Sequence, residues 1–140
     1  MRITICGSIT NADKIYAIEK DLINLGHETF SHELMHQFAN GDKTILEKVA
    51  LNHSKLKQDN DTFKWYYNAI KESDAILVCN FEKNNIAGYI GGSVLMEIGY
   101  AHVLDKKIFF LNPIPVVSFK DELIAASPVI INGDLNQIVK

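Results

Sequence analysis

The chain has 140 residues, of which 47% are hydrophobic and 22% are charged, and its formal net charge is −3. This length and composition are typical of a single compact domain, so we treat residues 1–140 as one unit. The slightly acidic balance argues against a broad nucleic-acid-binding surface, although backbone N–H groups could still bind one phosphate.

No apolar run is long enough to span a membrane, and the first one, at residues 3–6, is too short for a signal peptide. The two cysteines, Cys6 and Cys79, provide neither a disulfide framework nor a metal-binding spacing. Each ends an apolar run, as a reduced core cysteine would. We therefore expect a cytoplasmic protein with no membrane partner, no metal and no cofactor.

The first thirty residues predict a strand, a glycine turn, a helix and a second strand. The β-branched run at 2–6 is stopped by Gly7 and Ser8. A helix that opens at Asn11 or Asp13 carries apolar residues at helical spacing until Gly26, and residues 27–30 form a candidate strand. A strand, turn, helix and strand in this order begin an α/β fold.

The middle of the chain contains fewer clear signals. Residues 31–41 are expected to be irregular, and their His32, Glu33 and His36 lack the HExxH zinc pattern, so we interpret them as solvated or substrate-facing loop residues. Residues 43–57 predict an amphipathic helix, followed by a polar turn with Asp61 or Thr62 as the next helix cap. An aromatic stripe at 63–70 then has the spacing of a helix that packs on a core.

Two apolar runs in the second half, at 74–79 and 107–111, predict strands that are covered on both faces. The second run is stopped by the Asn-Pro-Ile-Pro segment at 112–115. A short helix at 121–126 and a last strand at 129–131 complete the pattern. Strands that alternate with helices indicate a parallel sheet with right-handed crossovers. We expect a flavodoxin-like or Rossmann-like α/β domain with about five strands and helices on both faces.

The stretch at 88–101, GYIGGSVLMEIGYA, combines a glycine-rich loop with an apolar helix. Ser93 is the expected N-cap, and the helix is apolar on nearly every face, so we expect it to be largely buried. Glu97 interrupts the apolar run, one position too late for a capping box. A carboxylate on a buried helix is costly unless it is paired or faces a cleft. Glu97 is therefore a candidate functional residue, and an acid that is merely favoured by the helix dipole is the alternative.

Ligands of open α/β sheets bind beyond the carboxyl ends of the strands. That edge gathers side chains and backbone groups from several parts of this sequence. The candidates that follow the first, third and fourth expected strands are Gly7, Ser8, Asn80, the loop at 88–93 and Asn112.

Three motifs resemble the nucleoside 2-deoxyribosyltransferase-like superfamily, which includes base-exchanging transferases and 2′-deoxynucleoside 5′-monophosphate N-glycosidases. They are ICGSI at 5–9, SDAILVCN at 73–80 and GGSVLMEIGYAHVLDKKIFFLNPIP at 91–115. The resemblance covers most of the chain, although residues 31–61 contribute little to it. It implies an enzyme that cleaves or transfers an N-glycosidic bond of a nucleoside or its 5′-monophosphate, and a homo-oligomer in which neighbouring subunits complete the pocket.

By this resemblance, Glu97 matches the catalytic carboxylate that attacks the anomeric carbon, and Asp74 matches an acidic position of the family. Gly7 and Ser8 match a loop that lies against the sugar or phosphate. With Cys6 beside them, the full set of expected substrate-binding residues is Cys6, Gly7, Ser8, Asn80, Gly88, Tyr89, Gly91, Gly92, Ser93 and Asn112.

The chain also departs from the family pattern. Transferases of the family have an acid about six residues before the catalytic glutamate, where this chain has Gly91. The tyrosine often found in the first-strand loop is replaced by the Cys6–Ser8 segment, and Tyr89 is a candidate substitute. Two alternatives therefore stay open: a nucleotide-binding or sensor module without catalysis, and a ribonucleoside-monophosphate phosphoribohydrolase, whose PGGxGTxxE motif is faintly similar to GGSVLME. The proton donor to the leaving base is also open, with Asp74, Tyr89 and a loop histidine as candidates.

Overall fold

The computed structural model describes residues 1–139, except for the side chain of Leu46. Its centre is a five-stranded parallel sheet in the order β2-β1-β3-β4-β5, which confirms the predicted fold class. The strands are β1 (Arg2–Cys6), β2 (Glu28–Phe30), β3 (Ala75–Val78), β4 (Lys107–Phe110) and β5 (Val129–Ile130). This is the flavodoxin-like strand order, in which the chain reverses its direction of winding between β1 and β3.

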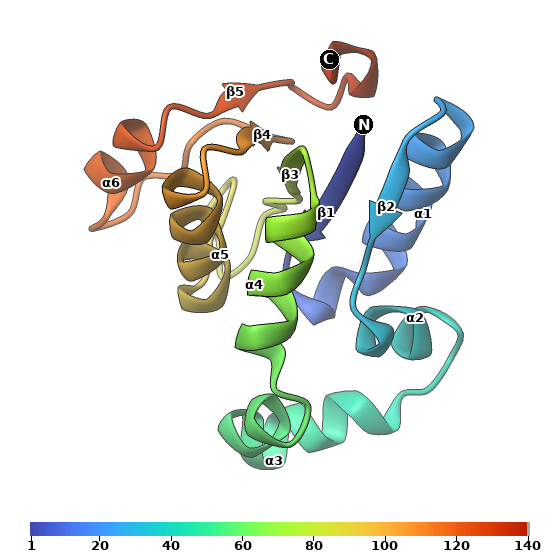
Figure 1. Cartoon of the computed structure of the whole chain (residues 1–140). Helices are drawn as coiled ribbons and strands as arrows, with labels where there is room; N and C mark the ends of the chain where they lie inside the picture. The colour runs from blue at the N-terminus through green and yellow to red at the C-terminus, as the bar shows by residue number, and fades with distance from the viewer. Residues whose placement is uncertain (140) are drawn as a thin grey trace.

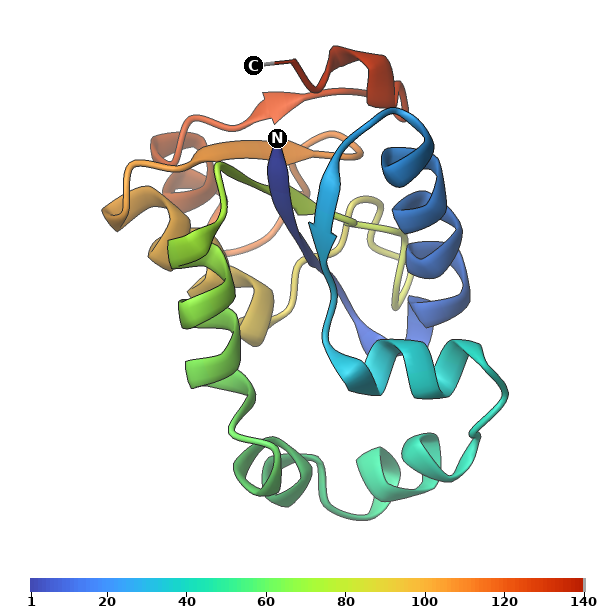
Figure 2. The same cartoon turned by 45° about the vertical axis from the view of Figure 1, so that its right-hand side comes forward.

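Helices cover both faces of the sheet (Figures 1 and 2). On one face lie α1 (Ala12–Asn24) and α2 (Glu33–Ala39), and on the other lie α4 (Thr62–Glu72), α5 (Gly92–Val103) and α6 (Lys120–Ala125). The helix α3 (Thr44–Asp59) lies apart from both layers, beyond the carboxyl end of β1 (Figure 2). It contacts α4, and its one buried side chain among those described, Ile45, belongs to the apolar core shared with α1 and α2.

The two apolar cores follow from the alternation of side chains along each strand. Ile3 and Ile5 of β1 pack with α1 and α2, whereas Cys6 faces α4 and α5. The same alternation in β3 sends Leu77 to the first core and Val78 to the second. The central strands are thus buried on both faces, as their continuous apolar sequence predicts.

Three local predictions were wrong. Residues 33–39 form α2 instead of an irregular loop, because His32 caps the helix by accepting a hydrogen bond from the Leu34 N–H at 3.1 Å. Ser93 is not the cap of α5, since the helix already begins at Gly92 with Gly91 as its N-cap. The helix α5 is also only half buried, because Met96 and Val103 are 43% and 77% exposed.

The aromatic stripe of α4 is likewise divided between core and surface. Tyr66 and Ile70 are buried, whereas Phe63 and Tyr67 are each 41% exposed. No helix within residues 1–139 has both the length and the apolar character needed to cross a membrane.

Candidate functional site

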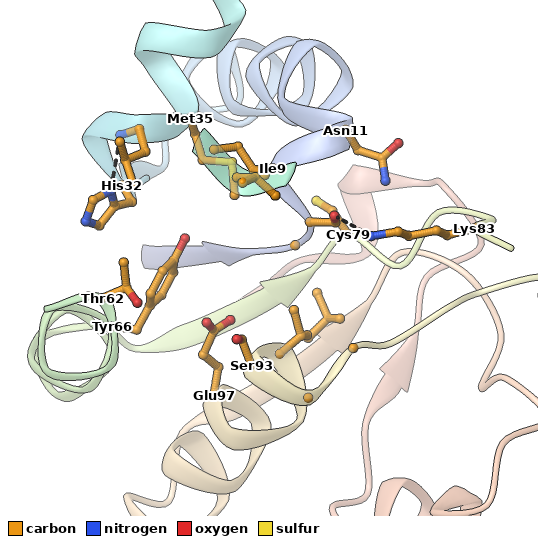
Figure 3. Close-up of a pocket in the computed structure, with 18 of the residues that line it drawn as sticks. Ile9, Asn11, His32, Met35, Thr62, Tyr66, Cys79, Lys83, Ser93 and Glu97 are labelled. Atoms are coloured by element: carbon orange, nitrogen blue, oxygen red, sulfur yellow. Dashed lines mark hydrogen bonds between the residues drawn. The ribbon is translucent and has the colours of Figure 1, made fainter. Parts of the chain in front are cut away.

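A pocket of about 400 Å³ lies at the carboxyl ends of β1 and β3. This is the point where the strand order reverses and where open α/β sheets bind their ligands. Its floor comes from the Gly7–Ser8 turn after β1, from residues 78–81 at the end of β3, and from the first turns of α5 (Figure 3). Its walls come from α2, α3 and α4. The pocket therefore unites segments that are far apart in the sequence.

Glu97 is the buried acid of this pocket. Its side chain extends from the second turn of α5 toward the cavity (Figure 3), and the residue is only 4% exposed. Burial raises the pKa of Glu97 to about 8, although a hydrogen bond with Cys6 and the positive charge of Lys57 oppose this shift. The Oε2 atom has no hydrogen-bond partner among the described residues. A buried carboxyl oxygen without a hydrogen-bond partner, facing a pocket, marks a candidate ligand-binding site.

Cys6 is fully buried and forms a hydrogen bond with Glu97. The pKa of its thiol is raised well above the ordinary value, first by burial and then by the nearby Glu97 charge and a hydrogen bond to Glu97. The thiol therefore stays protonated and acts as a donor to the carboxylate. Cys6 does not line the pocket, so it contacts Glu97 and is not placed to contact a substrate as the sequence had predicted.

Asn80 joins the floor of the pocket to the segment after β4 by hydrogen bonds. Its Nδ2 donates to the backbone oxygens of Asn112 and Pro113 at 3.0 and 3.1 Å, and its Oδ1 accepts from the Asn112 N–H at 2.9 Å. The Asn112 side chain returns a bond to the Asn80 carbonyl at 3.1 Å. Each side-chain amide bonds backbone groups of the other loop, so the observed role of the two residues is to hold the two loops together.

Gly88 belongs to the same junction. Its φ is +67°, and a Cβ at this position would lie 2.4 Å from the Pro113 carbonyl oxygen and 3.1 Å from Asn80 Nδ2. Glycine alone fits such an approach without displacing the backbone. Gly88 and Asn112 thus shape the loop that carries Tyr89 and Gly91 to the pocket, and neither lines the cavity itself.

Aromatic rings form one wall of the pocket. Tyr66 of α4 is 7% exposed, and its hydroxyl points into the cavity in Figure 3. Burial, followed by the charges of Glu97 and the two cysteines, raises its pKa well above the ordinary value, so the hydroxyl remains a donor. His32 stacks on Tyr66 with 6.1 Å between ring centroids and meets Trp65 edge-to-face at 4.8 Å. Burial lowers the pKa of His32, which favours its neutral form.

Positive charge gathers at the mouth of the pocket. The Lys83 Nζ donates to Ser8 Oγ at 3.3 Å and lies 5.7 Å from the Tyr89 ring centroid. The Lys57 Nζ donates to Ser93 Oγ in the first turn of α5. The pKa of His53 is lowered by partial burial and by the charges of Lys57 and Lys83, which places these cations close together. Such a rim suits an anionic ligand.

Eight of the twelve expected site residues line the pocket. They are Gly7, Ser8, Asn80, Tyr89, Gly91, Gly92, Ser93 and Glu97. Asp74 is at the opposite end of the sheet, where its Oδ2 accepts from the Arg2 N–H at 2.8 Å, a bond that lowers its pKa. The structure does not bring Asp74 to the pocket, because a residue that opens a parallel strand lies at the amino edge of the sheet.

Sequence reasoning missed Tyr66, Lys57 and Lys83 as pocket residues. Tyr66 was interpreted only as part of a core stripe. Neither a lysine on an amphipathic helix, such as Lys57, nor one in a loop, such as Lys83, differs in sequence from a solvated lysine. His36, one of the two loop histidines, lies outside the pocket and bonds Glu19 Oε2 at 2.7 Å. Within residues 1–139, no group of three or more metal-binding side chains has the arrangement needed to hold a metal ion.

Neither a protein-family model nor a curated protein sequence matches this chain. Among solved structures, the chain resembles the CMP N-glycosidase BcmB of Clostridium botulinum, with a TM-score of 0.56. The match covers 94% of this chain and 90% of that chain at 18% sequence identity. The two proteins share a fold.

Proposed function

We propose that this protein cleaves or transfers the N-glycosidic bond of a nucleoside or its 5′-monophosphate, with Glu97 as the catalytic carboxylate. The observation that carries the proposal is the unpartnered, buried carboxylate of Glu97 in a pocket at the sheet switch point. The sequence motifs around Glu97 and the fold shared with a CMP N-glycosidase support the same reaction class.

The chemistry follows from the charge that develops in the sugar. As the N-glycosidic bond breaks, positive charge builds at the anomeric carbon, and the Glu97 carboxylate bonds to that carbon while the base leaves with the bonding electron pair. The departing base nitrogen takes up a proton. Water then attacks the glycosyl ester, giving the free sugar or sugar phosphate and restoring the carboxylate. A second base that attacks in place of water gives a new nucleoside.

The surroundings of Glu97 fit this role in two ways. The low-dielectric site strengthens the attraction between the carboxylate and the cationic sugar, because little water competes for either charge. The Cys6 thiol and the packed α5 hold the side chain in one place, which limits the reorganisation needed during the reaction. The leaving base needs a proton donor, and the pocket residues that we consider as candidates are Tyr66, Tyr89, His32 and His53.

The test is base release, measured by chromatography with ribo- and deoxyribonucleosides, their 5′-monophosphates, and an optional second free base. We expect release from one substrate class and a loss of at least about 10³-fold in Glu97→Gln, as when a nucleophile is removed. The matched control is Glu72→Gln on the exposed surface of α4, which should retain full activity. Full activity in Glu97→Gln would exclude the proposed nucleophile.

The products distinguish the remaining possibilities. A new nucleoside identifies a transferase, and free sugar or sugar phosphate identifies a hydrolase. The rate should also rise with pH toward about 8, because kcat/KM follows the ionisation of the free enzyme and Glu97 must be a carboxylate. No release from any substrate, together with a ligand-dependent rise in Tm, would instead support a binding module, the reading that Gly91 in place of an acid favours.

A homo-oligomer is part of this proposal. Apolar side chains are exposed along the outer surface of α4 and α5, at Phe63, Tyr67, Met96 and Val103. Tyr67 of α4 meets Tyr100 of α5 edge-to-face at 5.6 Å, so the two helices contact each other on this side of the molecule. Light scattering coupled to size exclusion should give a mass above that of one chain, and Met96→Glu should lower it.

A further inference from the structure

The helix α3 covers the mouth of the pocket with little support from the rest of the molecule. Four of its residues, Val49, His53, Leu56 and Lys57, line the cavity. Ile45 is its only buried side chain among those described, and Leu51 is 86% exposed. A segment with so few buried contacts belongs to the least stable part of a fold.

The two ends of α3 and its middle are points where the backbone turns sharply. Gly41 before the helix has a φ of +100°, and Asp61 after it has a φ of +45°. Asn52 interrupts the helix with φ −158° and ψ 84°, and its Oδ1 accepts from the Lys55 N–H at 3.0 Å to start the second half. Non-helical backbone at these three positions separates the two halves of α3 from each other and from the neighbouring helices, and the hinges of moving segments are positions of this kind.

One side-chain bond joins the second half of α3 to the catalytic floor. The Lys57 Nζ donates to Ser93 Oγ, which belongs to the first turn of α5. The ammonium also lies 5.9 Å from the Phe63 ring centroid on α4. Lys57 thus connects α3 to the N-terminal end of α5, where the free N–H groups and the dipole of α5 favour negative charge.

We propose that α3 is a lid and that Lys57 couples its closure to an anionic group on the substrate. In the empty pocket Lys57 bonds a neutral hydroxyl, and when a phosphate binds between Ser93 and the Ser8–Lys83 rim, the ammonium transfers to that phosphate. A bond between two charged groups is stronger than the bond it replaces, so an anionic substrate holds the lid closed more firmly than a neutral one. The inference rests on the proposed function and makes a 5′-phosphorylated nucleoside its preferred substrate.

The decisive variant is Lys57→Met, which keeps an apolar stem of similar length and removes the charge. We expect kcat/KM for the nucleoside 5′-monophosphate to fall by about 10- to 100-fold, the typical effect of losing a hydrogen bond to a charged group. The unphosphorylated nucleoside should lose less, because it loses only the effect of the Lys57 charge on the ionisation of Glu97. The ratio of the two kcat/KM values should therefore fall by about 10-fold. The matched control is Lys55→Met on the same helix, because Lys55 is exposed and pairs with Asp59 at 2.9 Å away from the pocket.

Hydrogen exchange of the wild-type protein tests the lid without relying on turnover. The probe is inorganic phosphate, with chloride at equal ionic strength as the control. Phosphate should slow exchange in residues 44–59 of the wild-type protein and of Lys55→Met, and this protection should be lost in Lys57→Met.

The outcomes separate this inference from the proposed function. Base release with equal losses on both substrate classes in Lys57→Met would overturn the coupling and leave the reaction intact. Phosphate protection that persists in Lys57→Met, or is absent from the wild type, would overturn the lid. Absence of base release from every substrate would overturn the proposed reaction, while the exchange measurement would still decide for or against the lid.

Discussion

The floor and the cover of the pocket are built in opposite ways. The floor, formed by the ends of β1 and β3, the 80–93 loop and Glu97, is buried and is cross-linked by the Asn80 and Asn112 amides. The cover, residues 33–59, is formed by two helices, one short and one broken, and α3 is mostly exposed. The difference indicates that Glu97 is held rigidly, whereas α2 and α3 have more freedom to change their positions.

The largest expected effect on the free energy of unfolding comes from the ionisation of Glu97 in the floor. The pKa of Glu97 is about 8 in the folded protein, whereas the ordinary pKa of a glutamate is 4.5, so the folded state retains a proton that the unfolded chain releases between these values. This contribution to stability is complete below about pH 4.5 and is lost as the pH rises through 8. The free energy of unfolding should therefore fall by up to about 4 kcal/mol over this range.

Urea denaturation of the wild type and of Glu97→Gln at pH 5 and pH 8.5 measures this loss. The difference between the two proteins isolates Glu97 from the histidines, because they titrate in both. Glu97→Gln should become progressively more stable than the wild type as the pH increases. A constant difference across this range would show that the carboxyl titrates normally and that the floor is more hydrated than the structure indicates.

Two glycines test the rigidity of floor and cover directly. Gly88 and Gly41 both have positive φ, but a Cβ at Gly88 would strike the Pro113 carbonyl, whereas a Cβ at Gly41 would meet nothing within 4 Å. Gly88→Ala should cost about 3 kcal/mol or more, and Gly41→Ala about 1–2 kcal/mol from backbone strain alone. Chemical denaturation measures both, and equal costs would contradict the contrast between the two regions.

The sequence predicted the floor well because its signals are local. Each strand is a short apolar run stopped by glycine, proline or asparagine, and parallel strands place their carboxyl ends at one edge. Glu97 was found because a single acid in an apolar helix has few structural explanations. The role of Asn80 and Asn112 was not foreseen, because an amide that bonds backbone and one that bonds a ligand look alike in a sequence.

In the cover, the amphipathic pattern at 43–57 predicted a helix where α3 lies, whereas α2 and the break in α3 were not predicted. The seven residues of α2 are too few for a clear helical repeat, and a histidine cap is unusual. The break at Asn52 lacks the glycine or proline that normally marks one. Tyr66 and Lys57 reach the pocket only through the tertiary placement of α3 and α4, which no local spacing reveals.

The bond between Glu19 of α1 and His36 of α2 should contribute less to the free energy of unfolding than the interactions in the floor do. Glu19 is 5% exposed, and its Oε2 bonds His36 Nε2 at 2.7 Å while its Oε1 accepts from Thr29 Oγ1 at 3.2 Å. His36→Ala leaves this buried carboxyl with one partner, so we expect a loss of about 2 kcal/mol in the free energy of unfolding. Gln37→Ala on the exposed side of α2 is the control and should change stability by less than about 0.5 kcal/mol.

The smallest expected effect is on the local stability of α3, the proposed lid. Asn52→Ala removes the acceptor that bonds Lys55 N–H and Ser54 Oγ, both at 3.0 Å, and so removes the N-terminal cap of the second half of α3. Loss of a cap costs about 1 kcal/mol. Because this half of α3 is mostly exposed and only its Leu56 packs against the core, the cost should appear as about fivefold faster hydrogen exchange in residues 53–59, with the denaturation midpoint unchanged. A lower midpoint instead would mean that α3 unfolds together with the sheet, and the floor and cover would then be one cooperative unit.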